Sequence, residues 1–120
     1  MERMVCFEQL QACQEAHRLV LMVYQATKGF PGEEKFWLVS QMRRAAVSVP
    51  ANIAEGFKRR GIQEKMRFYN ISEGSLEELK YYFILSKDLG YVSSNADLAA
   101  QSEMVGRLLN GLITSTERRR

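Results

Sequence analysis

Apolar side chains recur at steps of three or four residues through four long stretches of this 120-residue sequence. Steps of this size place side chains on one face of an α-helix. The pattern therefore predicts four amphipathic helices, over about residues 6–28, 33–58, 62–88 and 94–117. Short turns separate them, with Gly90 expected just past the end of the third helix. No linker divides the chain, so we expect an all-α protein with one domain over residues 1–120.

Helices of this length joined by short links favour an antiparallel up-down-up-down four-helix bundle. The apolar face expected for the second helix consists of Phe36, Leu38, Met42, Ala45, Val49 and Ile53. Pro50 falls inside this helix, where it removes one backbone N–H and crowds the carbonyl four residues earlier. We therefore expect helix two to be kinked near Pro50; a break into two helices is the alternative.

Several classes of protein are disfavoured by composition. No apolar run reaches the roughly 18–20 residues that span a bilayer, and the first six residues lack the order of a signal peptide. The expected location is cytoplasmic, without a membrane. Cys6 and Cys13 would lie about 10 Å apart along one predicted helix, too far for a disulfide, so free thiols are expected. With one histidine and no Cys-x-x-Cys spacing, we expect no metal site and no cofactor.

Positive charge is concentrated in the middle of the chain. The net charge is +3, but the segment from Gln41 to Arg67 holds seven Lys or Arg against two Glu. An up-down bundle would join much of this segment with Arg3 and the terminal run Arg118 to Arg120 at one pole. Such a pole suits phosphates, although a solvated basic face is the plainer interpretation. The candidate nucleic-acid-binding residues are Arg43, Lys58, Arg59, Arg60, Lys65 and Arg67.

Polar residues also recur at helical spacing. Arg44, Ser48, Asn52 and Glu55 share one face of helix two, and Ser75 and Glu78 share a face of helix three. We expect a structural polar network inside the bundle, in which Arg44 pairs with Glu55 or Glu78. On this basis, Arg44→Ala should lower the melting temperature more than Arg43→Ala. Gly74 in mid-helix suggests that another helix or side chain comes close there.

An enzymatic interpretation has little support. Glu55 and Glu78 would be paired carboxylates, but no second catalytic element accompanies them. The Glu-x-x-His spacing of di-iron bundles is absent, and no motif joins Ser, His and Asp into a triad. We therefore expect no catalytic residues.

Two longer segments resemble a known family. They are FPGEEKFWLVSQMRRAAVSVPANIAEGFKRR and RFYNISEGSLEELKYYFILSKDLGY, and they resemble the family named after 23S rRNA intervening sequences. Its motif positions are occupied by Gln41, Arg43, Arg44, Ser48, Pro50, Asn52, Glu55, Gly56, Gly74, Ser75 and Glu78. Members are similar to accessory proteins of diversity-generating retroelements, which form pentameric rings. The resemblance implies a four-helix bundle, a homopentamer, and RNA or DNA and a reverse-transcriptase-like protein as partners.

Two functions follow as expectations. The first is a non-enzymatic, oligomeric bundle that binds nucleic acid, with RNA expected, through its basic ends. The alternative is an oligomeric protein-interaction scaffold with no nucleic-acid role. Its interfaces would be marked by exposed aromatic side chains, namely Phe36, Trp37, Tyr81, Tyr82 and Tyr91.

Overall fold

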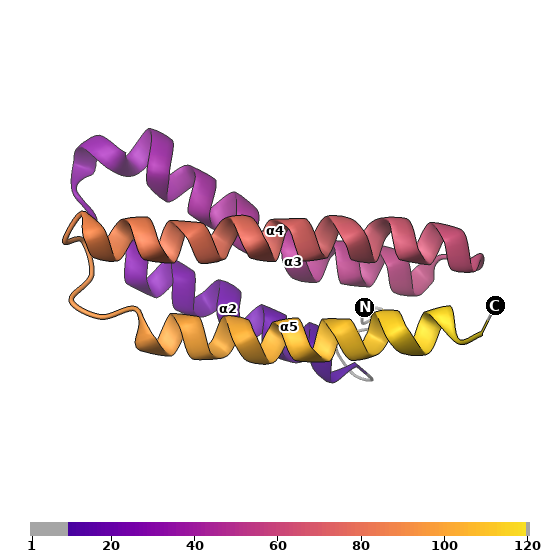
Figure 1. Cartoon of the computed structure of the whole chain (residues 1–120). Helices are drawn as coiled ribbons and strands as arrows, with labels where there is room; N and C mark the ends of the chain where they lie inside the picture. Colours follow the sequence, from indigo (N-terminus) through magenta and orange to yellow (C-terminus); the bar gives the residue numbers. More distant parts are fainter. Residues whose placement is uncertain (1–9, 120) are drawn as a thin grey trace.

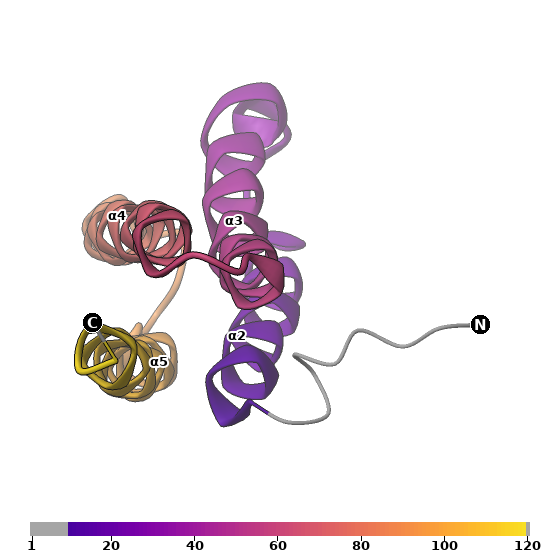
Figure 2. The ribbon, with the colours of Figure 1, turned by 90° about the vertical axis from the view of Figure 1, so that its right-hand side faces the viewer.

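The computed structural model describes residues 10–119, and over this range the chain is all-α without a β-strand. The four α-helices are α2 (Gln11–Thr27), α3 (Ser40–Lys58), α4 (Ile62–Asp88) and α5 (Ala96–Glu117). Figure 1 shows them as long rods packed along one another, and the end view of Figure 2 places α4 and α5 on one side and α3 and α2 on the other. The prediction of four helices is confirmed for the described residues.

The helix α2 starts later than the predicted helix over residues 6–28. Leu10 has extended backbone angles, φ −109° and ψ 117°, so α2 begins only at Gln11. Residues 6–9 of the predicted helix lie outside the described residues. At its other end, the Thr27 hydroxyl donates to the Val23 carbonyl at 2.8 Å.

Two other kinds of turn precede α3. They are a 3₁₀ turn, η1 (Gly32–Glu34), and a π turn, η2 (Lys35–Val39). Each hydrogen bond of a π turn spans five residues rather than four. The side chains of η2 therefore do not point in the directions that α-helical spacing predicts. Leu38 and Val39 are buried, whereas Phe36 is 88% exposed. The prediction that Phe36 belongs to the core face is therefore wrong.

Pro50 lies within α3 without ending it. The helix runs from Ser40 to Lys58 through Pro50, so the alternative of two separate helices is wrong. The proline is buried. A kink at this position stays a prediction.

Cys13 is fully buried on α2, and its sulfur is disulfide-bonded. The expectation of a free thiol is therefore wrong for Cys13. The spacing argument assumed that one helix carries both cysteines, whereas α2 begins only at Gln11. Cys6 lies outside the described residues.

The core collects buried side chains from all four helices. It includes Leu19, Val23, Met42, Val49, Ile53, Leu76, Leu79, Phe83, Val105 and Leu109. α3 contacts α2 and α4, and α5 contacts α4 and α2, so every helix packs against two neighbours. These side chains are mostly the ones that the periodic pattern assigns to the interior.

The contact between α3 and α4 is the most extensive between two helices. The Ser86 hydroxyl, near the end of α4, lies 3.5 Å from the sulfur of Met42, near the start of α3. Further along the pair, the buried Ser72 hydroxyl donates to the Val49 carbonyl at 2.8 Å. Contacts between polar groups therefore join the two helices both near the start of α3 and further along it.

A glycine sets how closely this pair approaches. A Cβ atom at Gly56 would lie 2.6 Å from the Tyr69 ring and 3.1 Å from the Lys65 carbonyl oxygen. Tyr69 is only 1% exposed, so its ring has no free space to enter. Position 56 therefore requires glycine for close packing.

Gly74 does not have the close neighbour that its mid-helix position suggested. No atom lies within 4 Å of the place where its Cβ would stand, and the residue is exposed. The prediction of a close approach at Gly74 is wrong. That approach occurs instead at Gly56.

Alanine substitutions at these two glycines should act in opposite directions. Gly56→Ala should lower the free energy of unfolding by about 1–3 kcal/mol, because the new methyl group clashes with Tyr69 and Lys65. Gly74→Ala should raise it by about 0.5–1 kcal/mol, because alanine has the higher helix propensity. Urea unfolding followed by circular dichroism measures both. Equal effects of the two variants would contradict the close approach at Gly56.

Candidate nucleic-acid interface

Exposed cations from three elements gather at one end of the molecule, which we call the basic end. It consists of Lys58, Arg59, Arg60, Arg67, Arg118 and Arg119, all exposed. Figure 1 shows the α3–α4 turn and the end of α5 at the same end, and in Figure 2 both face the viewer. The charge of Arg119 acts on Lys65 and Tyr69 near the start of α4, which places the end of α5 beside α4. Arg3 and Arg120, also expected here, lie outside the described residues.

Phe68 organises two of these arginines. The guanidinium carbons of Arg59 and Arg67 lie 4.8 and 4.5 Å from the centre of its ring. Each also forms an ion pair with a glutamate close in sequence, Arg59 with Glu55 at 2.8 Å and Arg67 with Glu64 at 3.3 Å. Cation–π contacts of this kind hold the guanidinium groups in place while leaving them exposed.

Glu55 therefore has a different role from the predicted one. It was a candidate partner for Arg44, but its carboxylate pairs with Arg59, the residue that directly follows α3. Glu55 thus belongs to the basic end and lowers its net charge.

Lys65 points inward and caps α3. Its ammonium group donates to the carbonyls of Phe57 at 2.8 Å and Gly56 at 3.2 Å. Because the last carbonyls of a helix lack partners within the helix, a cation there is stabilising. Burial, together with the nearby charge of Arg119, lowers the pKa of Lys65. The structure thus gives Lys65 a structural contact, where the sequence suggested only a phosphate ligand.

Arg43 is not brought to the basic end. It lies fifteen residues before Lys58 on the same helix, about 22 Å along the axis. Its Nε donates to the Thr27 hydroxyl oxygen at 3.0 Å, and its guanidinium covers the Tyr24 ring at 4.4 Å. Arg43 therefore fastens α3 to the end of α2.

The aromatic residues near the basic end are largely occupied. Tyr69 is buried against Gly56, while Phe57 and Phe68 are half-buried, each with a cation over its ring. Base stacking needs an open ring face. The basic end therefore offers charge more than stacking surfaces.

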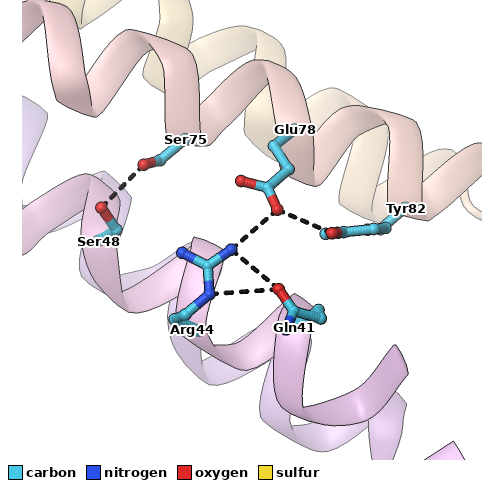
Figure 3. A network of polar contacts seen from close by, with 6 residues as sticks. All are labelled: Gln41, Arg44, Ser48, Ser75, Glu78 and Tyr82. Carbon is cyan, nitrogen blue, oxygen red and sulfur yellow. Dashed lines mark hydrogen bonds and ion pairs between the residues drawn. The ribbon is translucent and has the colours of Figure 1, made fainter. Parts of the chain in front are cut away.

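Polar contacts join α3 to α4 closer to the middle of the pair (Figure 3). Arg44 donates to the Glu78 carboxylate at 2.9 Å and to the Gln41 side chain at 3.0 Å. Tyr82 donates to the same carboxylate at 2.7 Å. Of the two partners expected for Arg44, the structure selects Glu78.

A second group of contacts adjoins this one. The hydroxyls of Ser48 and Ser75 lie 2.8 Å apart, and the Asn52 amide donates to the Ser48 hydroxyl at 2.9 Å. The Arg44–Glu78 contact lies at the surface rather than inside the bundle, since the Arg44 side chain is 56% exposed, whereas these serine and asparagine contacts are partly buried. Gln41 and Tyr82 were not predicted, although each lies three or four residues from a predicted member on the same helix face.

Two tyrosines in this region have raised pKa values. Burial raises the pKa of Tyr69. The pKa of Tyr82 is also raised, mainly by burial and to a smaller extent by the hydrogen bond to Glu78 and the negative charge of that carboxylate. Both effects favour the protonated phenol in the folded state.

Other kinds of site find no support among the described residues. Between residues 10 and 119, no three His, Cys, Asp or Glu side chains are grouped so that they would hold a metal ion. No helix in the same range combines the length and the apolar character needed to cross a membrane.

The comparison with protein families agrees with this fold. The sequence pattern of the 23S rRNA-intervening sequence protein family matches residues 8–111, nearly the whole chain. The protein therefore belongs to this family. No curated protein matches it.

The contacts of the two neighbouring arginines reverse the ranking expected from sequence. Arg43→Ala should lower the free energy of unfolding by about 1–2 kcal/mol, because it loses a charged hydrogen bond to the end of α2 and a ring contact. Arg44→Ala should cost less than about 1 kcal/mol, because its ion pair is exposed. Chemical unfolding of both variants measures the difference. A larger loss for Arg44→Ala would restore the original ranking.

The raised pKa of Tyr82 predicts how stability depends on alkaline pH. The folded phenol holds its proton to higher pH than the unfolded one, so this stabilisation is complete below about pH 10 and is lost above it. Lys65 acts in the opposite direction, because its lowered pKa penalises folding while the ammonium is protonated. Unfolding by urea between pH 8 and 11 should give a flatter alkaline decline for Tyr82→Phe than for Tyr81→Phe. Identical declines would contradict the assignment to Tyr82.

Proposed function

We propose that this protein is a non-enzymatic, oligomeric bundle that binds nucleic acid, with RNA as the preferred ligand, through its basic end. The observation that carries the proposal is the convergence of exposed cations from the end of α3, the start of α4 and the end of α5. Neutralising phosphates with several cations releases counterions, which supplies affinity without base-specific contacts. The family name, which refers to ribosomal RNA, is consistent with such a ligand.

The proposal includes an up-down-up-down course of the four helices. Lys80, in the second half of α4, lies 3.4 Å from Glu103, in the first half of α5. Lys65, near the start of α4, interacts electrostatically with Arg119, which follows the end of α5. Residues later in α4 thus lie beside residues earlier in α5. Together with an antiparallel α3–α4 pair, this course supports a single basic end formed by segments far apart in the sequence.

We also propose a homo-oligomer, for which the resemblance to retroelement accessory proteins implies a pentamer. Several basic ends in one assembly would bind one RNA molecule with increased avidity. A reverse-transcriptase-like protein and a cytoplasmic location are further parts of the proposal. Native mass spectrometry of the purified protein measures the number of subunits.

Binding to a labelled single-stranded RNA should weaken steeply as the salt concentration rises. The variant Lys58→Glu/Arg59→Glu/Arg60→Glu should make the slope of log K against log[salt] shallower by about 2, because each phosphate contact contributes roughly 0.7. Fluorescence anisotropy between 50 and 300 mM KCl measures this slope. A DNA strand of the same sequence tests the preference for RNA.

A matched control reverses three exposed cations outside the basic end. Arg18→Glu/Lys28→Glu/Lys87→Glu changes the net charge equally, and it should keep most of the wild-type slope. A localised interface would be contradicted if the affinity for RNA did not depend on salt concentration. It would also be contradicted if both triple variants weakened RNA binding equally. Absence of RNA and DNA binding in the wild-type protein would instead favour the protein-interaction scaffold.

A further inference from the structure

A groove lies at the junction of η2, α2 and α3, away from the basic end. We call it the aromatic–cationic groove. It is open to solvent and has a volume of about 580 Å³. The residues that mainly line it are Tyr24, Lys35, Phe36, Arg43, Arg44 and Val47. Phe36 is 88% exposed and the neighbouring Trp37 is 58% exposed. Large aromatic side chains that stay this exposed mark an interaction surface.

The lining has charge of one sign. Lys35, Arg43 and Arg44 contribute three cations, and no carboxylate belongs to the lining. Arg44 already pairs with Glu78 outside the lining, and Glu34 accepts a hydrogen bond from Tyr91, so Lys35 and Arg43 are the cations left for a ligand. A ligand that complements the groove therefore carries negative charge beside an apolar group.

Two of these cations are already held in place. Arg43 is fixed by the Thr27 hydroxyl, and Arg44 by Gln41 and Glu78. Fixed guanidinium groups lose little further conformational freedom when they bind a carboxylate. The groove is thus organised before a ligand arrives.

The aromatic rings favour a protein ligand over RNA. The guanidinium of Arg43 covers Tyr24 at 4.4 Å, and the ammonium of Lys35 lies over Phe36 at 5.5 Å. A cation of this chain therefore already covers one face of each ring, which leaves at most one face for a stacked base. The apolar side chains of Val39 and Val47 between them suit aliphatic or aromatic side chains of a peptide.

We propose that the aromatic–cationic groove binds a segment of a partner protein in which acidic residues alternate with apolar ones. The apolar side chains pack on Phe36 and Val47, and the carboxylates pair with Lys35 and Arg43. This inference does not depend on nucleic-acid binding at the basic end, because the two surfaces share no residue.

The test uses the full chain with three defined probes: a 12-residue peptide of alternating Asp and Leu or Phe, the same peptide with Lys for Asp, and a 12-nucleotide poly(U). Fluorescence anisotropy gives affinities, and methyl NMR shifts of Val39 and Val47 locate the binding. The acidic peptide should bind at least about 10-fold more tightly than the basic one. Equal binding of the two peptides would overturn the proposal.

Two pairs of variants make the location testable. Phe36→Ala should weaken the affinity for the acidic peptide at least about 10-fold. Tyr81→Ala removes another ring, one that is 58% exposed, and should change this affinity less than about 2-fold. Lys35→Glu should weaken binding and Lys87→Glu should not.

Other occupants of the groove would overturn the inference. The groove would be identified as an RNA site if poly(U) shifted the Val39 and Val47 signals and the acidic peptide did not. The occupant would be identified as a second copy of this chain if Phe36→Ala abolished self-association and the acidic peptide did not bind.

Discussion

The close approach of α3 and α4 at Gly56 is the constraint on which the rest of the structure depends. Because Gly56 has no side chain, the ring of Tyr69 packs directly against the α3 backbone. This contact brings the start of α4 near enough for Lys65 to reach the last carbonyls of α3. The turn between the two helices is thereby fixed, and Lys58, Arg59 and Arg60 are presented beside Arg67. The basic end is thus a consequence of close helix packing.

Two cations near this end, Lys65 and Arg67, oppose the local helix dipole, whereas those at the ends of α3 and α5 agree with it. Cations in the first turns of a helix are disfavoured by its dipole, and α4 carries Lys65 and Arg67 there. Lys65 is compensated by α3, whose carbonyls it caps. Arg67 is compensated by Glu64 and by the Phe68 ring. These contacts keep positive charge at this end of the molecule with a modest loss of stability.

Most of the fold was predictable because burial imposes helical periodicity on the sequence. The limits of α4 and α5 and the end of α3 agree closely with the apolar pattern, and Gly90, expected beyond the third helix, has φ 79°. The start of α3 does not agree, because the helix begins at Ser40 rather than near residue 33. The pattern failed where the backbone leaves α-helical geometry. A π turn over Lys35–Val39 has no signature in hydrophobic spacing, so Phe36 was assigned to the core although it is exposed. Likewise, spacing on one helix does not reveal which glycine faces a neighbour, and therefore Gly74 was chosen over Gly56.

Contacts between helices were predictable only in outline. Glu78 was one of two partners predicted for Arg44, because residues at helical spacing share a face, but the pairing of Glu55 with Arg59 instead depends on side-chain rotamers. Lys65 and Arg43 were assigned to nucleic-acid binding because charge alone was visible in the sequence. Their hydrogen bonds to carbonyl and hydroxyl groups of other helices arise only from tertiary packing.

The central claim is that RNA binds at the basic end, and photocrosslinking tests it most directly. Full-length protein irradiated with a 4-thiouridine-containing RNA, digested and examined by mass spectrometry, should yield crosslinked peptides from residues 57–68 and from the end of α5. Crosslinks confined to other segments, such as η2 or the middle of α4, would contradict the account, as would a complete lack of crosslinks under conditions of saturating RNA.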